Sequence, residues 1–213
     1  MQTLNSVSQK LPDPPPTLHP AAGPSRKALI FLFLALVALY SYCAPRWNDW
    51  NQNSRLSLVR SVVDYGTVQI DKFASTTGDY AFYKGHYYSD KPPGPALAGI
   101  APYALLKLAI SNPVGDWAIN QFAKSKTLDQ TFNQTGDQVS ALRDKVIGAL
   151  ARIGLSILLA GIPTALMICL FWRWAYQVLG RYWLSLSLAL GLALGTTLFP
   201  YSSLFYNHAL AAS

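Results

Sequence analysis

The run at 85–94 (GHYYSDKPPG) places a lysine, an aspartate, a histidine and two tyrosines directly before a long apolar tract. The two prolines that follow Lys91 disfavour helix at that lysine and favour extended backbone. We therefore expect Lys91 to lie at a membrane boundary, where an ammonium group can bind the phosphate oxygens of a lipid-linked substrate. The alternative is that Lys91 only extends its amine toward water while the tyrosines mark the membrane surface.

The composition predicts an integral membrane protein. Of the 213 residues, 51% are hydrophobic and 13% are charged, whereas a soluble domain carries about a quarter charged residues. Apolar tracts at 28–43 and 184–200 contain no charged residue, and a third at 146–172 contains only Arg152. Each is near the roughly 17–25 residues needed to cross a bilayer. A cleaved signal peptide explains the first tract less well, because a long proline-rich segment precedes it and a cleavage site is absent.

A fourth apolar tract, 94–110, decides the topology, since it either spans the membrane or lies along its surface. Prolines and glycines interrupt this tract and it contains Lys107, as is typical of interfacial or re-entrant segments. If it lies in the interface, the basic N-terminal tail and the basic segment 173–183 both face the cytoplasm, which the positive-inside rule favours. We therefore predict an interfacial segment, a cytoplasmic N-terminus and a location in the cell (inner) membrane.

These assignments predict an all-α, multi-span helical bundle with a large external loop. The net charge of +7 comes mainly from the segments assigned inside, so the basicity indicates membrane orientation rather than nucleic-acid binding. Because the sequence ends within an apolar tract, we expect a fragment of a larger multi-span protein. The predicted order is a disordered cytoplasmic tail (1–27), a first span (28–44), the external loop (45–145), a second span (146–172), a cytoplasmic loop (173–183), a third span (184–200) and the start of a truncated fourth helix (201–213).

The external loop contains a segment with helical periodicity at 54–65. Ser54 can cap the start of this helix and Gly66 can end it, and Arg60 and Asp64 form an i,i+4 pair. We predict a short amphipathic helix that lies on the membrane. The remainder is less regular: we expect extended chain at 67–71, a turn at 76–79, and loop with short helical pieces at 112–144.

Several motifs of this loop together resemble the GT-C membrane glycosyltransferases, in particular the protein O-mannosyltransferases and the lipid A aminoarabinose transferases. They are Asn53-Ser54-Arg55-Leu56, Gly66-Thr67, Gly85-His86-Tyr87-Tyr88 and Lys91-Pro92-Pro93. The resemblance covers roughly 28–210 and includes the order of spans and interfacial helices. It implies transfer of a sugar from a polyprenyl-phosphate donor to a lipid, glycan or protein acceptor at the outer face.

The resemblance also implies roles for individual residues. An external carboxylate deprotonates the acceptor hydroxyl while fixed cations stabilise the leaving phosphate. Lys91 would bind the phosphate and Arg55 would place the loop or the phosphate. Further substrate-binding candidates are His86, Tyr87, Tyr88 and His208.

The position of the general base is an open point in this sequence. The acid of these families stands just before the arginine, where this chain has Gln52-Asn53-Ser54, and amides cannot act as a base. Asp49 and Asp90 are therefore the candidate catalytic carboxylates. The alternatives are a solvated loop acid for Asp49 and an ion pair or turn acid beside Lys91 for Asp90.

Other functions and ligands fit parts of the sequence. A non-catalytic membrane protein, or an assembly or binding subunit derived from the same family, is the alternative to an enzyme. No cofactor is required, although His86, His208 and one aspartate are of the types that bind a divalent metal. Arg152 lies within a predicted span, where a charge is costly unless it is paired or lies near the membrane interface. Anchoring of the helix at the interface explains this arginine as well as substrate binding does.

Overall fold

The computed structural model describes residues 23–43, 49–123 and 139–205. Most of these residues are helical, as predicted, and one two-stranded sheet is present that the all-α assignment did not include. The helices are α1 (Arg26–Tyr42), α2 (Trp50–Tyr65), α3 (Gly94–Ser111), α4 (Pro113–Ala123), α6 (Val139–Ser156), α7 (Ile162–Leu179), α8 (Tyr182–Leu194) and α9 (Leu198–Ser202). A 3-10 helix η1 (Asp71–Thr76), a π-helical turn η2 (Ile157–Gly161) and the strands β1 (Tyr80–Tyr83) and β2 (His86–Ser89) complete the described elements.

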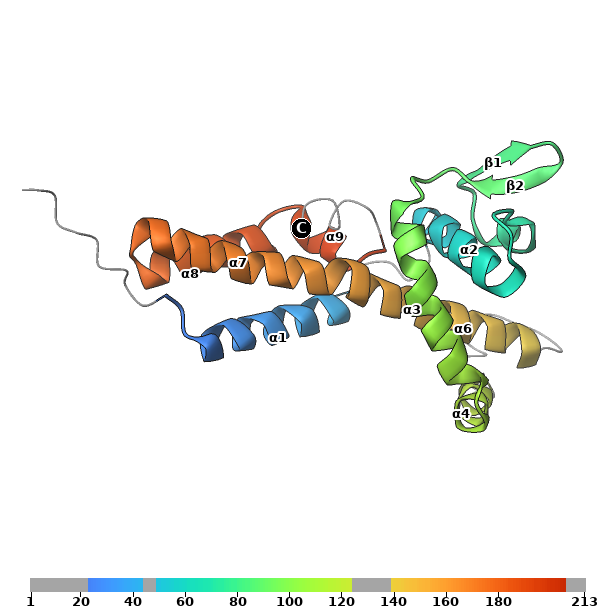
Figure 1. The fold of residues 1–213 in the computed structure, drawn as a ribbon, viewed down its shortest axis with the longest axis horizontal. Coiled ribbons are helices and arrows are strands. Elements are labelled where there is room, and N and C mark those ends of the chain that lie inside the picture. Colours follow the sequence, from blue (N-terminus) through green and yellow to red (C-terminus); the bar gives the residue numbers. More distant parts are fainter. Residues whose placement is uncertain (1–22, 44–48, 124–138, 206–213) are drawn as a thin grey trace, which may run out of the picture.

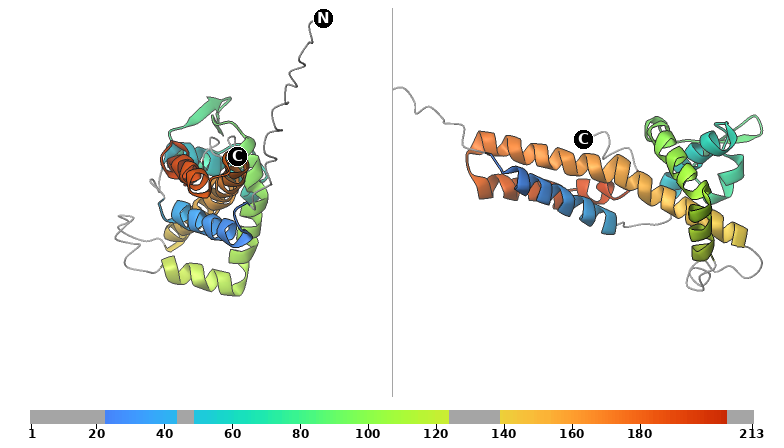
Figure 2. Two further views of the ribbon diagram at one scale, coloured as in Figure 1. Left: turned by 90° about the vertical axis from the view of Figure 1, so that its left-hand side faces the viewer. Right: turned by 60° about the horizontal axis from the view of Figure 1, so that its bottom comes forward.

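Helices α1, α7 and α8 form a bundle along the long axis of the molecule (Figures 1 and 2). Large apolar side chains are also exposed on its outer surface, among them Phe31, Leu170 and Trp183. Helices that are apolar both inside and outside a bundle are typical of a lipid environment. The buried core contains Leu32, Leu36, Tyr40, Ala165, Ile168, Cys169, Trp172, Ala189 and Ala193.

The longest helix runs through α6, η2 and α7 without a break. Its apolar portion, Leu142–Leu179, has 38 residues, or about 57 Å at 1.5 Å per residue. A bilayer core is about 30 Å thick, so this helix is long enough to cross a membrane and to project well beyond it. The helix therefore extends beyond the predicted second span, 146–172, at both ends. The α6 part leaves the bundle and enters the other half of the molecule (Figure 1).

Helix α3 is the second described helix that is long and apolar enough to cross a membrane, but it runs steeply across the direction of the bundle (Figure 1). It packs on α2 and α6 in a second core. Gly99 permits the close approach, because a Cβ at this position would lie 3.2 Å from Cγ2 of Val59. The buried members of the second core are Leu56, Val59, Ala96, Tyr103, Ala151, Leu155 and Phe205.

Helix α2 differs from the predicted amphipathic surface helix. It begins at Trp50, and the carboxylate of Asp49 caps it by accepting a hydrogen bond from Asn51 N at 2.9 Å. Ser54 is therefore inside the helix and does not cap it, whereas Gly66 ends it in the left-handed conformation, as predicted. The first half of α2 is buried although it is polar: Gln52, Asn53, Ser54, Arg55 and Ser57 are all buried.

The strands β1 and β2 form an antiparallel hairpin that the sequence did not predict. Tyr80 pairs with Ser89 and Tyr83 pairs with His86. The connecting residues Lys84 and Gly85 both have positive φ, 50° and 87°, as a two-residue type I′ turn requires. Before the hairpin, η1 occupies 71–76, where the sequence indicated extended chain as far as 71.

The end of the described chain also differs from the prediction. The predicted third span, 184–200, is divided, because α8 ends at Leu194 and α9 begins only at Leu198. The hydroxyl of Thr196 accepts a hydrogen bond from Leu198 N at 3.2 Å within this break. Residues 201–202 end α9 rather than starting a fourth helix, and 206–213 lie outside the described residues.

The basic residues of the predicted cytoplasmic segments lie at one end of the bundle. Arg26 and Lys27 begin α1, Arg173 lies in the second half of α7 and Arg181 lies in the α7–α8 connection; all four are exposed. Figure 1 shows the start of α1 and this connection at the same end, with α2, α3 and the hairpin at the other. The predicted loop 173–183 is mostly helical, with Gly180 ending α7 in the left-handed conformation at φ 62°.

Candidate functional site

Lys91 lies between two carboxylates at the end of the hairpin. Its Nζ is 2.9 Å from Oδ2 of Asp79 and 3.3 Å from Oδ2 of Asp90. Asp79 directly precedes β1 and Asp90 directly follows β2, so strand pairing brings the two acids together. Burial lowers the pKa of Lys91, but the two carboxylates outweigh it and raise the pKa above its ordinary value. The lysine is therefore charged, and this Lys91 cluster has a formal charge of minus one.

The proline pair after Lys91 does not form a continuous extended segment. Pro93 has helical dihedral angles (φ −76°, ψ −14°) and is the N-terminal cap of α3. Lys91 is consequently held two residues before the N-terminal cap of α3, and its side chain is only 18% exposed.

The structure assigns ordinary structural contacts to both candidate bases. Asp49 caps α2, and Asp90 pairs with Lys91. Asp79 was missed in the sequence, since nothing in the sequence near Lys91 indicates that strand pairing returns the chain to this point. The Lys91 cluster thus contains one predicted acid and one unpredicted acid.

The aromatic run before Lys91 attaches the hairpin to η1. Asp71 accepts hydrogen bonds from Tyr87 N at 2.6 Å and is paired with Nδ1 of His86 at 2.8 Å. These contacts lower the pKa of Asp71, the bond from Tyr87 having the larger effect. Tyr87 packs its ring against Tyr80 at 4.8 Å, and Tyr88 bridges to Gln69. His86, Tyr87 and Tyr88 therefore have structural contacts that can also place them near a substrate.

The described residues show no cluster of side chains that would support the divalent-metal hypothesis. Across 23–43, 49–123 and 139–205, no three His, Cys, Asp or Glu side chains are grouped as a metal site needs. His208, which was predicted to bind substrate and was a possible ligand, lies outside the described residues.

The first turns of α2 join the hairpin segment to the bundle of α1, α7 and α8. Ser54 Oγ lies 2.7 Å from Ser89 Oγ, and Asn53 Nδ2 donates to Thr76 O at 2.8 Å. Arg55, predicted to contact substrate, is 2% exposed inside this helix and donates to Asn51 O at 3.4 Å. Its depth favours a role in holding α2 in place.

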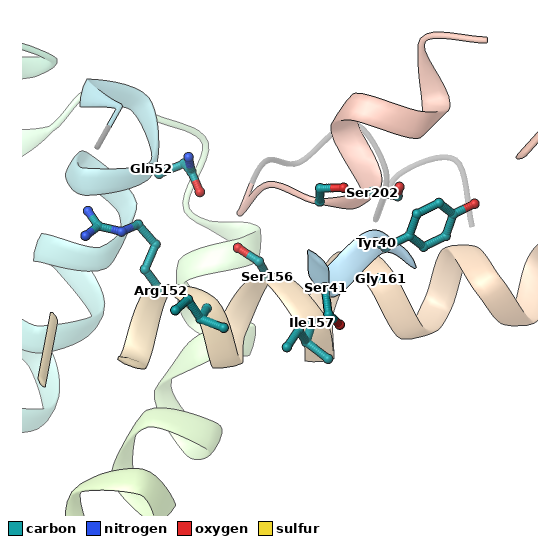
Figure 3. A pocket seen from close by; sticks show the side chains of 10 residues that line it. Tyr40, Ser41, Gln52, Arg152, Ser156, Ile157, Gly161 and Ser202 are labelled. Carbon is teal, nitrogen blue, oxygen red and sulfur yellow. The ribbon is translucent and has the colours of Figure 1, made fainter. Parts of the chain in front are cut away.

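A pocket lies on the other side of these turns, where α1, α2, α9 and the long helix meet (Figure 3). Arg152 enters it from α6 and donates a hydrogen bond to Asn53 Oδ1. Gln52 Oε1 accepts from Phe205 N at 3.1 Å. The π-helical turn η2 begins at Ile157, and such turns are frequent at functional sites. The lining residues are Tyr40, Ser41, Gln52, Arg152, Ile153, Ser156, Ile157, Gly161, Ser202 and Ser203.

Comparison with family models, curated proteins and solved structures finds no match to this chain. The Lys91 cluster and the Arg152 pocket, which α2 joins, are therefore the features from which a function is proposed.

Proposed function

We propose that the protein is embedded in a membrane through α1, α7 and α8, with its basic end in the cytoplasm. Support comes from the grouping of Arg26, Lys27, Arg173 and Arg181 at one end of an apolar bundle, which fits the positive-inside rule. If the start of α1 and the α7–α8 connection both lie on the cytoplasmic side, α1 crosses to the outer side and α7 crosses back. The elements between the end of α1 and the start of α7 then lie on the outer side. Helix α3 then lies along the outer interface, in keeping with its steep crossing of the bundle (Figure 1).

We further propose that the protein transfers a sugar from a polyprenyl-phosphate donor to an acceptor at the outer face. The observation that carries this proposal is the grouping of Lys91 with Asp79 and Asp90, at the end of the molecule opposite the basic end. A cation and a carboxylate in one place are the two groups that such a transfer needs. The resemblance of the external motifs to GT-C glycosyltransferases supports the same reaction.

The chemistry assigns one role to each member of the Lys91 cluster. A carboxylate accepts the proton of the acceptor hydroxyl, whose oxygen attacks the anomeric carbon as the bond from that carbon to the phosphate oxygen breaks. The Lys91 ammonium stabilises the phosphate charge that forms. Asp90 is the more exposed acid, at 38% against 28% for Asp79, so we assign the proton transfer to Asp90. Asp49, as a helix cap, is the second choice.

One observation favours a non-catalytic binding subunit as the second candidate. Buried amides, Gln52 and Asn53, occupy the start of α2 where the resembled enzymes have an acid, and both acids near Lys91 are ion-paired. In a binding subunit, the Lys91 cluster would hold the hairpin against the start of α3 and would have no catalytic role.

Turnover in proteoliposomes separates these two functions. The protein is reconstituted with polyprenyl phosphates that carry radiolabelled mannose, glucose or aminoarabinose, together with a membrane extract as acceptor. An enzyme should release polyprenyl phosphate from at least one donor and label the acceptor, while protein-free liposomes should not. Donor binding without release of polyprenyl phosphate from any donor would contradict sugar transfer and favour the binding subunit.

Cysteine labelling tests the proposed topology. Ser75 in η1 and Gln177 near the end of α7 are both exposed and lie at opposite ends of the molecule. In a background with Cys43→Ser and Cys169→Ala, we expect an impermeant maleimide to label Ser75→Cys but not Gln177→Cys in intact cells. Lysed cells should label both. Labelling of Gln177→Cys alone in intact cells would show that the orientation is opposite to the one proposed.

A further inference from the structure

We propose that the pocket around Arg152 binds the phosphate group of an anionic membrane lipid. The inference rests on the membrane insertion proposed above and not on sugar transfer, so binding at this pocket can be tested in a protein that transfers nothing.

The charge of Arg152 has no carboxylate partner within the described residues. Arg60, Lys91, Lys107, Arg143 and His86 are among the residues that form ion pairs there, whereas Arg152 is not. Its hydrogen-bond partner is the neutral amide oxygen of Asn53. A guanidinium has five N–H donors, so most of them are left for a ligand. A cation held among apolar helices with a neutral partner is costly, and an anion would reduce that cost.

The two cationic sites therefore differ in the ligand charge that they favour. The Lys91 cluster already contains two carboxylates for one ammonium, so a phosphate there meets the attraction of the ammonium together with the repulsion of two carboxylates. The Arg152 pocket has a net positive charge and attracts an anion at neutral pH. A resting anionic ligand is thus expected at Arg152 rather than at Lys91.

The walls of the pocket are polar at one side and apolar at the other. Ser156 lies one turn beyond Arg152 on the same helix face, and both side chains rise toward α2 (Figure 3). Its hydroxyl has no hydrogen bond to another residue of the described chain, so it can donate to a phosphate oxygen. Ile153 and Ile157 supply apolar surface beside these polar groups.

The depth of the pocket matches the level of lipid headgroups. Tyr40 and Ser41 place it at the C-terminal end of α1, opposite the basic start of that helix. The 17 residues of α1 span about 26 Å, close to the roughly 30 Å of a bilayer core. A lipid whose chains lie against the bundle would therefore bring its phosphate to Arg152 at the outer boundary.

A binding titration of the purified protein in neutral detergent tests the proposal. The probes are farnesyl phosphate, the uncharged farnesol, phosphatidylglycerol and inorganic phosphate, each measured by microscale thermophoresis. Arg152→Gln should weaken binding of the lipid phosphates about tenfold or more, the worth of one charge-assisted hydrogen bond, while Arg152→Lys should retain most of it. Arg143→Gln is the matched control on the same helix, because Arg143 is paired with Asp116, and it should bind like the parent.

Each result decides a part of the proposal. Farnesyl phosphate bound more tightly than phosphatidylglycerol identifies a polyprenyl phosphate as the ligand, and equal binding identifies phospholipid headgroups in general. If Arg152→Gln does not fold, Ser156→Ala should still weaken binding severalfold without removing the charge. Lipid-phosphate binding within twofold of the parent in the folded Arg152→Gln protein, equal binding of farnesol, or binding of inorganic phosphate alone would overturn the proposal.

Discussion

Replacing Lys91 by alanine should lower the rate of sugar transfer by about a hundredfold or more, the usual effect of losing one group that stabilises charge in a transition state. The ammonium lies within 3.3 Å of both acids of the cluster, so it is placed to stabilise the leaving phosphate while a carboxylate accepts the acceptor proton. The rate is measured as release of polyprenyl phosphate in proteoliposomes. Lys91→Arg should recover only part of it, because a planar guanidinium positions its charge differently.

Three further variants show whether the loss of rate is specific to Lys91 and which carboxylate is the base. Lys84→Gly removes another lysine of the hairpin, at a position whose φ of 50° suits glycine, and should leave the rate unchanged. Asp90→Asn should lose roughly a hundredfold to ten-thousandfold if Asp90 is the base, and Asp79→Asn much less. Transfer by Lys91→Ala within about twofold of the parent would place the reaction elsewhere. Equal rates for both aspartate variants and the parent would exclude these acids as the base.

Local sequence signals predicted the features that depend on near neighbours. Gly66 ends α2 because only a residue without Cβ adopts its left-handed conformation easily. The Arg60–Asp64 pair forms at 3.7 Å because side chains four residues apart share a helix face. The apolar tracts predicted the bundle helices, and the charge distribution predicted which segments share the basic end.

The features that the sequence did not predict depend on contacts between distant segments. Ser54 and Ser89 are 35 residues apart and still form a hydrogen bond, which helps to explain why the polar start of α2 is buried rather than at a surface. Asp79 reaches Lys91 only through the hairpin, whose Lys84-Gly85 turn lacks the strong Asn-Gly or Asp-Gly signal. The aromatic run gave two interpretations, a substrate-binding segment and a surface belt, and neither was a strand, because strand alternation and an interfacial belt require the same residue types.

The long helix shows a different limit of sequence reasoning. Hydropathy located the apolar centre of the predicted second span but not the ends of the helix, since Val139–Ser156 continues through Arg143, Asp144 and Lys145. Arginine and lysine are good helix formers, and packing of one helix face outweighs the lower propensity of the aspartate. The same extension brings Arg152 beside Asn53, so the Arg152 pocket exists only because the helix projects past the bundle.

Replacing Asp64 by alanine should lower the free energy of unfolding by about 2 kcal/mol. It removes one of the two carboxylate partners of the buried Arg60, which keeps Asp144, and it removes the partner of the partly exposed Lys107. Asp64 is 13% exposed and lies 3.7 Å from Arg60 Nε and 2.7 Å from Lys107 Nζ. It also accepts a hydrogen bond from the Tyr103 hydroxyl at 3.0 Å. One carboxylate of α2 thus binds two residues of α3. Its loss should weaken the packing of α2 on α3, the helix that follows Lys91. Titration with SDS in mixed micelles measures the change.

Asp116→Ala is the matched control, since Asp116 also pairs with an arginine but is 44% exposed. An exposed pair contributes about 1 kcal/mol or less, so the control should unfold close to the parent. Asp64→Ala should cost less in a Lys107→Met background, because the two substitutions remove the same ion pair and cannot be additive. Strict additivity would show that Lys107 and Asp64 do not interact in solution. A loss for Asp64→Ala no larger than for Asp116→Ala would mean that the α2–α3 contact is held by its apolar residues alone.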